Sequence, residues 1–103
     1  MLTRDDFEKA YERVAPHVYR TPLLTSRSLN EVTGFDIRLK AELFQKGGSY
    51  KVRGPINLIG LLTEEERAKG VICSSAGNHS QGVAIAAQQY GIQAVVCMAT
   101  NAT

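Results

Sequence analysis

Two glycine-bearing segments each bring reactive side chains to the expected start of a helix. They are residues 46–51, KGGSYK, and residues 74–79, SSAGNH. In parallel α/β sheets, ligands gather at the carboxyl ends of strands, where helix amino-termini present free N–H groups and a positive dipole end to anions. Because a Gly-Ser start is also a common way to cap a helix, the spacing alone leaves anion binding and simple capping open.

Lys51 is the residue in these segments that is best placed to act as a nucleophilic amine. It lies in the first turn of the helix that Ser49 is expected to cap. A cation there opposes the helix dipole, which disfavours the ammonium form and suits an amine that forms a Schiff base. Arg53 would add to this effect if its side chain points the same way. Tyr50 is expected either to pack against its neighbours or to flank a planar cofactor.

Nucleotide-binding and hydrolase motifs are absent. Residues 77–82 have the GxxxxG spacing of a phosphate loop, but Val83 and Ala84 follow where Lys and Ser or Thr are required. Neither a GxGxxG fingerprint nor a GxSxG elbow is present.

No metal site is predicted either. His17 and His79 are isolated, and Cys73 and Cys97 lack the CxxC spacing of zinc or redox sites. Both cysteines are therefore expected to be buried free thiols.

Composition restricts the class of protein further. The 103 residues are 44% hydrophobic and 21% charged, which is typical of one globular domain. The net charge of +2 is spread over scattered lysines and arginines, so nucleic-acid binding is not expected. No stretch approaches the roughly 20 apolar residues of a membrane span, and the amino terminus lacks a signal-peptide pattern. A cytoplasmic protein that does not bind membranes is expected.

The hydrophobic pattern predicts alternating helices and strands. Helices are expected at residues 4–15, 26–32, 49–62 and 78–90, with a short acidic turn between Thr63 and Gly70. Pro55 is expected to kink or restart the third of these helices. Strands are expected at residues 37–43, 71–73 and 92–98, and an extended segment around Pro22. This order is typical of α/β units with a mostly parallel sheet. Since no helix follows the last strand, the chain is expected to be cut short.

Two strings resemble the motifs of one enzyme family. Residues 43–54, LFQKGGSYKVRG, with Asn57 beyond them, resemble the lysine motif of fold-type II pyridoxal-phosphate (PLP) enzymes, and residues 74–84 are similar to their substrate-carboxylate loop. The similarity extends through residues 20–23 and 91–98, and the nearest relatives would be threonine dehydratases and serine racemases. The resemblance implies a parallel-sheet, three-layer α/β fold like that of the tryptophan synthase β-subunit. Residues 1–103 would be the amino-terminal portion of the catalytic domain, without a second complete domain.

The same resemblance assigns roles to residues. Lys51 would hold PLP as a Schiff base and, once freed by the substrate, act as base on the Cα proton. Tyr50 would lie against the cofactor ring, and Asn78 would hydrogen-bond its phenolic oxygen. The substrate carboxylate would be bound by the loop that contains Ser75, Gly77, Asn78 and His79. The implied reaction is loss of the β-hydroxyl from serine or threonine, which gives a 2-oxo acid and ammonia.

The chain departs from the family pattern at three positions and lacks two of the family's cofactor-binding elements. Ala76 stands where the racemases of this type have a serine that serves the opposite face of the substrate, so elimination is favoured over racemisation. Gly47 and Pro55 replace the family's more usual threonine and alanine. The glycine-rich phosphate loop and the partner of the pyridine nitrogen are not found in these residues, so the short chain is expected to be inactive alone.

Two alternative functions remain: a serine racemase-like enzyme, and a non-catalytic phosphate-binding or structural fragment. Because members of the family usually pair, a homo-oligomer is possible.

Overall fold

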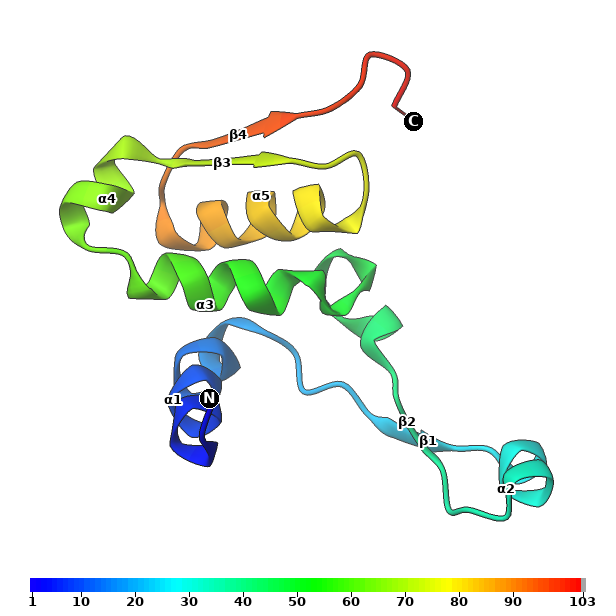
Figure 1. The fold of residues 1–103 in the computed structure, drawn as a ribbon. Helices are drawn as coiled ribbons and strands as arrows, with labels where there is room; N and C mark the ends of the chain where they lie inside the picture. The colour runs from blue at the N-terminus through cyan, green and yellow to red at the C-terminus, as the bar shows by residue number, and fades with distance from the viewer. Residues whose placement is uncertain (103) are drawn as a thin grey trace.

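A computed structural model describes residues 1–102 of the chain (Figure 1). Five helices and four short strands follow one another in this part. The helices are α1 (Arg4–Val14), α2 (Arg27–Thr33), α3 (Arg53–Leu61), α4 (Glu64–Lys69) and α5 (Asn78–Tyr90). The strands are β1 (Leu23–Thr25), β2 (Arg38–Lys40), β3 (Val71–Ser74) and β4 (Ala94–Cys97). Single 3₁₀ turns lie at Ala15–His17, Glu42–Phe44, Lys46–Gly48 and Tyr50–Val52.

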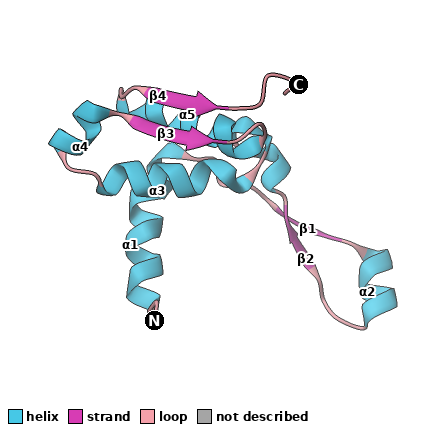
Figure 2. Ribbon diagram, turned by 45° about the horizontal axis from the view of Figure 1, so that its top comes forward, coloured by secondary structure: helices cyan, strands magenta, loops and turns pink. Residues whose placement is uncertain are grey.

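The centre of the fold is the unit formed by β3, α5 and β4. The two strands pair in parallel, with Val71 opposite Ala94 and Ser74 opposite Cys97. Helix α5 connects them and lies against one face of the pair, while α3 packs on α5 and α1 packs on α3 (Figure 2). The core lies between these helices and consists of Val14, Val52, Ile56, Ile59, Ala86 and Ala87. A parallel βαβ unit was predicted from the alternation of elements, and the structure confirms it.

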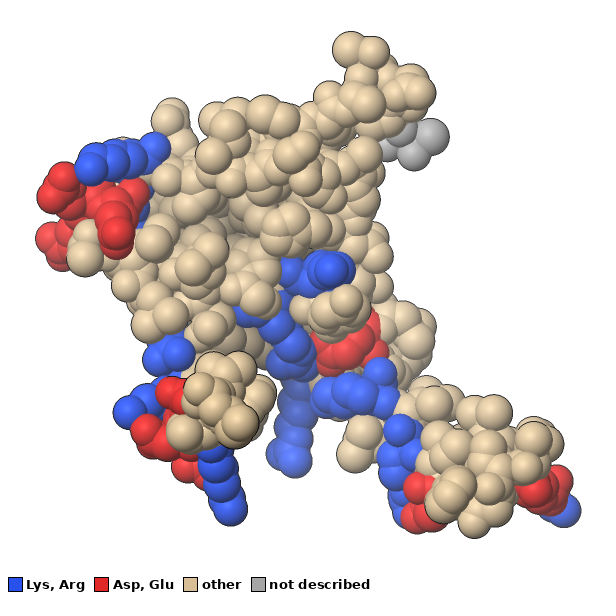
Figure 3. Space-filling model, in the orientation of Figure 1, with Lys and Arg blue, Asp and Glu red and all other residues tan. Residues whose placement is uncertain are grey.

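The second face of the β3–β4 pair is uncovered within residues 1–102. Ile72 and Val95 point to it and are 72% and 56% exposed. Figure 3 shows that the region over β3 and β4 carries few charged side chains, which lie instead over α1, α4, the arm and the segment between α3 and the arm. Cys97 is also exposed, and Cys73 is half-buried. The prediction that both thiols are buried is therefore wrong, because alternate residues of β4 face the uncovered side.

Residues 23–40 form an arm that extends away from the core (Figures 1 and 2). β1 and β2 pair antiparallel, with Leu24 opposite Leu39, and α2 lies at the tip of the arm. All residues of both strands are exposed. The radius of gyration is 16.6 Å, whereas a compact domain of this length has about 13 Å. The strand predicted at residues 37–43 is shorter than expected, because the chain turns inward at Ala41 and forms a 3₁₀ turn from Glu42.

The predicted helix ends agree with the structure. Thr3 with Asp6 and Thr63 with Glu66 form capping boxes, and Gly34 and Gly91 end their helices in the left-handed conformation, with φ of 74° and 65°. The helix predicted at residues 49–62 is divided as expected. A 3₁₀ turn covers Tyr50–Val52 and α3 begins at Arg53, which puts Pro55 in the first turn. There its missing N–H has no intrahelical acceptor to lose.

Replacing Thr63 with alanine is expected to lower the free energy of unfolding by about 1 kcal/mol. The N–H of Glu66 donates to the Thr63 hydroxyl at 3.2 Å, and the Glu66 carboxylate accepts the N–H of Thr63 at 2.8 Å. Alanine removes the first of these contacts and leaves a helix N–H without its cap. Urea unfolding followed by circular dichroism measures the change, with Thr100→Ala in the exposed turn after β4 as the control. Equal stability of the two variants would contradict the capping role.

None of the helices in residues 1–102 combines the length and the apolar character that crossing a lipid bilayer requires.

Candidate active site

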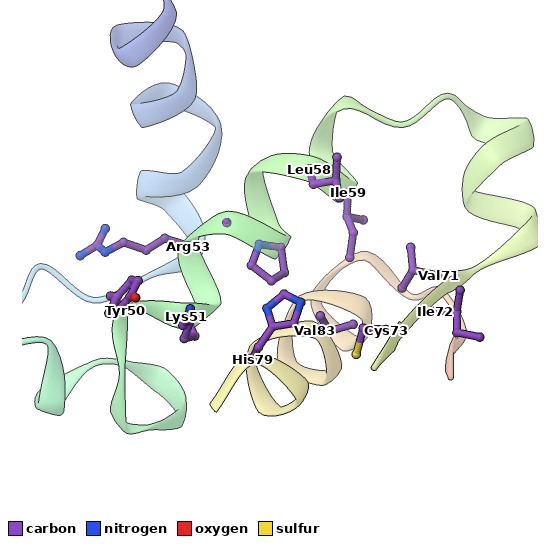
Figure 4. A pocket seen from close by; sticks show the side chains of 12 residues that line it. Tyr50, Lys51, Arg53, Leu58, Ile59, Val71, Ile72, Cys73, His79 and Val83 are labelled. Carbon is purple, nitrogen blue, oxygen red and sulfur yellow. The ribbon is translucent and has the colours of Figure 1, made fainter. Parts of the chain in front are cut away.

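A pocket of about 450 Å³ opens where the start of α3, the edge of β3 and the first turns of α5 meet (Figure 4). Its walls are mostly apolar and include Pro55, Leu58, Ile59, Val71, Ile72 and Val83. Tyr50, Lys51 and His79 also line it. The structure thus brings together three of the residues singled out in the sequence, from segments more than 20 positions apart.

Lys51 is held by its backbone. It lies in the 3₁₀ turn Tyr50–Val52, and its N–H donates to the Ser49 hydroxyl at 3.3 Å, as the predicted cap requires. On the opposite side its backbone lies directly on α5. A Cβ atom added to Gly82 would come within 2.3 Å of the Lys51 carbonyl oxygen. Only glycine at this point of α5 permits such a close approach.

The amine of Lys51 differs from those of the other lysines. Each of the other four has an oxygen partner at 2.6–2.9 Å: Asp5 for Lys9, the Thr21 carbonyl for Lys40, the His17 carbonyl for Lys46 and Glu65 for Lys69. No such partner for Lys51 is found among the described residues. Its Nζ instead lies 5.1 Å from the centroid of the Tyr50 ring. The amine is therefore available for reaction on the edge of the pocket.

Arg53 does not reinforce the charge at Lys51. Its guanidinium binds Glu42, with Nε 2.7 Å from Oε2 and Nη2 2.8 Å from Oε1, and Figure 4 shows the side chain directed away from His79. Hydrogen bonding to Arg53 lowers the pKa of Glu42 from 4.5 to about 2 against the opposing effect of burial, with Thr21 and Lys40 assisting. Arg53 was expected to disfavour the ammonium form of Lys51 only if its side chain pointed the same way. Because the side chain binds Glu42 instead, this effect is not expected.

The segment 75–79 is shaped by backbone contacts. The N–H of Ser75 donates to the Cys97 carbonyl at 3.0 Å, and the Ser75 hydroxyl accepts the N–H of Gly77 at 3.2 Å. Gly77 precedes α5 and supplies no side-chain cap. Ser75 and Gly77 lie in this turn and Asn78 begins α5. Of the four predicted loop residues, only His79 is part of the pocket wall.

Two residues that hold this arrangement were not recognised as important from the sequence. Gly82 had a detectable signal, since a glycine inside a helical pattern indicates a close approach of another backbone. Glu42 had none, because it lies 11 positions before Arg53 and within a segment that was predicted to be a strand. Within residues 1–102, no group of three or more His, Cys, Asp or Glu side chains is placed to hold a metal ion.

Comparison with known proteins identifies the family. The profile of the family described as "Pyridoxal-phosphate dependent enzyme" matches residues 14–103. The chain is 51% identical over 95% of its length to the L-threonine ammonia-lyase of Thermotoga maritima, and covers 24% of that protein. Its structure is similar to that of maize serine racemase, with a TM-score of 0.90 and 41% identity, over 96% of this chain and 30% of that one. The processed form of threonine deaminase isoform 2 from Solanum lycopersicum gives a TM-score of 0.82 and 33% identity, over 99% and 30% of the two chains.

These matches confirm the family that was predicted from the strings at residues 43–54 and 74–84. Because the structural similarity covers nearly the whole chain, the fold is that of the type II PLP enzymes, as predicted. The chain spans about a quarter to a third of the length of these relatives. It belongs to the family of pyridoxal-phosphate dependent enzymes.

Proposed function

We propose that Lys51 binds PLP covalently and that the protein catalyses β-elimination of L-threonine or L-serine to a 2-oxo acid and ammonia. The observation that carries this proposal is the amine of Lys51, which has no oxygen partner among the described residues and lies at the edge of an apolar pocket. Residues 1–103 are the amino-terminal portion of the catalytic domain in this proposal. Elimination then requires the further chain that the relatives possess.

The residues around Lys51 fit an aromatic aldehyde. The pocket volume of about 450 Å³ lies in the range of about 300–1,000 Å³ that small-molecule sites occupy. Leu58, Ile59 and Val83 offer apolar contact, and the exposed Tyr50 ring lies beside the amine that would bind the aldehyde. The donor set is therefore a primary amine with an aromatic neighbour and an apolar wall, which suits a planar cofactor better than a metal ion or a nucleotide.

Lys51 and the 75–79 segment have different roles in the proposed reaction. Lys51 anchors the cofactor and, after release, takes the Cα proton of the substrate on Nζ. In the 75–79 segment, the N–H groups at the start of α5, with Ser75, Asn78 and His79, hold the substrate carboxylate. Asn78, the residue before His79, would also hydrogen-bond the phenolic oxygen of the cofactor, although its side chain is not part of the pocket wall described above. When bound, PLP supplies the electron sink that stabilises negative charge at Cα.

Ala76 favours elimination over racemisation. Racemisation needs a proton donor on the face of the substrate opposite Lys51, and the methyl group of Ala76 cannot provide one. Relatives of both kinds exist, since the solved structures include a serine racemase and a threonine deaminase. Racemisation is therefore the second candidate, and a donor from another segment would be needed to support it.

Borohydride reduction is expected to fix the pyridoxyl group on Lys51 in preference to the other four lysines. The purified chain is mixed with a limiting amount of PLP, its visible absorbance band is recorded, and the reduced product is digested for peptide mass spectrometry. Lys51 reacts first because its amine lies at the apolar pocket, which can retain the cofactor ring. Lys40 and Lys46 donate to backbone carbonyls, and Lys9 and Lys69 lie in exposed ion pairs away from that pocket.

Lys51→Arg serves as the control, since arginine keeps the charge and cannot form the linkage. The variant should lose the preferred label while Lys9 and Lys69 remain as reactive as before. Label spread evenly over all five lysines of the unaltered chain would contradict the proposed function.

A further inference from the structure

The carboxylate of Glu42 binds two partners from different parts of the chain. Both of its oxygens accept hydrogen bonds from Arg53, at 2.7 and 2.8 Å, and Oε1 also accepts the Thr21 hydroxyl at 2.5 Å. The Glu42 side chain is 16% exposed and Thr21 is buried. A forked, charge-assisted contact of this kind fixes the direction of both side chains more strictly than a single hydrogen bond does.

Glu42 itself is attached to a braced segment. Gln45 is 4% exposed, and its side chain accepts the N–H of Tyr19 at 2.9 Å and donates to the Tyr19 carbonyl at 2.8 Å. Lys46 Nζ donates to the His17 carbonyl at 2.7 Å. These contacts tie residues 17–21 to residues 42–46, so Glu42 offers Arg53 a fixed point rather than a mobile one.

Arg53 passes this constraint to Lys51. Arg53 is the first residue of α3, and its N–H donates to the Tyr50 carbonyl, which closes the 3₁₀ turn that contains Lys51. That turn is therefore restrained from two directions, by Gly82 of α5 against the Lys51 backbone and by Glu42 through Arg53. Neither contact involves the amine itself.

We infer that Glu42 is a positioning residue, which acts through Arg53 to fix the direction in which the Lys51 amine leaves its turn. The inference rests on the proposed role of Lys51 as the residue that binds the cofactor. Glu42 does not line the pocket and need not touch cofactor or substrate. Its contribution is to the geometry of the amine and not to affinity for the cofactor.

The test compares the rate at which Lys51 is labelled by PLP and borohydride in the unaltered chain, in Glu42→Gln and in Arg53→Lys. Glu42→Gln is expected to lower the maximal rate of Lys51 labelling roughly tenfold, as loss of a charge-assisted hydrogen bond implies. The PLP concentration at half-maximal rate should change little, which separates orientation from binding. Arg53→Lys keeps the charge without the fork and should give an intermediate loss.

Arg67→Gln is the matched control. Arg67 donates to the carbonyls of Ile59 and Gly60 at 3.2 and 3.0 Å and so holds the opposite end of α3. Its replacement removes a comparable contact from the same helix, but the Lys51 labelling rate should stay as in the unaltered chain. Circular dichroism establishes that each variant is folded under the labelling conditions.

Amide hydrogen exchange of residues 50–52 provides a readout that is independent of PLP. Glu42→Gln should accelerate exchange there roughly tenfold, whereas Arg67→Gln should affect only the carboxyl end of α3. Unchanged exchange at residues 50–52 in Glu42→Gln, or an unchanged labelling rate at a selectively labelled Lys51, would overturn the inference. If the unaltered chain shows no preference for Lys51, the proposed function fails, and the exchange result still decides whether Glu42 positions the turn.

Discussion

The Gly82→Ala variant is expected to lose about 2–3 kcal/mol of unfolding free energy, because overpacking of a tight contact carries a cost of this size. The new Cβ atom would lie 2.3 Å from the carbonyl oxygen and 2.7 Å from the carbonyl carbon of Lys51. Both atoms belong to the backbone, so no side-chain rotation relieves the overlap. The gain of about 1 kcal/mol that alanine brings to a helix interior offsets only part of this cost.

Urea unfolding of the variant measures the loss, and selective labelling of Lys51 should decrease in parallel. Gly54→Ala is the control for stability, since a Cβ atom there meets no atom within 4 Å. That variant should be as stable as the unaltered chain or slightly more stable. A Gly82→Ala chain as stable as Gly54→Ala would show that α5 does not approach Lys51 this closely.

Acidification is expected to remove on the order of 3 kcal/mol of stability through Glu42 alone. Its pKa is about 2 in the folded chain, against the ordinary value of 4.5 for the unfolded one. A carboxylate with a lowered folded pKa binds fewer protons in the folded state than in the unfolded one. The stabilisation is therefore complete above pH 4.5, decreases as the pH falls, and is lost once the pH passes through about 2.

Urea unfolding at a series of pH values between about 2 and 6 tests this expectation. Hydrogen bonds from the Thr3 backbone and side chain also lower the pKa of Asp6, so Asp6 contributes a change in the same direction. Because Asp6 is present in both chains, the difference between the unaltered chain and Glu42→Gln isolates Glu42. That difference should shrink toward zero at the acid end. A difference that stays constant with pH would refute the assigned titration.

Much of the fold was predictable because its signals are local. The capping residues Thr3 and Thr63 and the helix-ending glycines Gly34 and Gly91 lie within a few positions of the ends they define. The restart of a helix near Pro55 follows from the chemistry of one residue. The position of Lys51 in a capped turn was predictable for the same reason.

The rest depends on contacts that sequence spacing does not encode. The forked pair of Glu42 and Arg53 forms only because the chain leaves β2 and turns inward at Ala41. The exposure of Cys97 depends on which face of the strand pair a helix covers. Likewise, His79 lines the pocket while Asn78, its neighbour, does not, because successive residues of a helix lie about 100° apart around its axis.

The arm also has a consequence for the entropy of the unfolded chain. Contacts of Tyr19 with Gln45 and of Thr21 with Glu42 hold the two ends of the arm together. In terms of chain entropy, residues 22–41 are therefore one long loop that is closed at its base. The entropic cost of closing a flexible loop rises by only about 0.6 kcal/mol when its length doubles. Insertions or deletions near Gly34 should therefore be tolerated by the core, because no residue of the arm belongs to the core cluster.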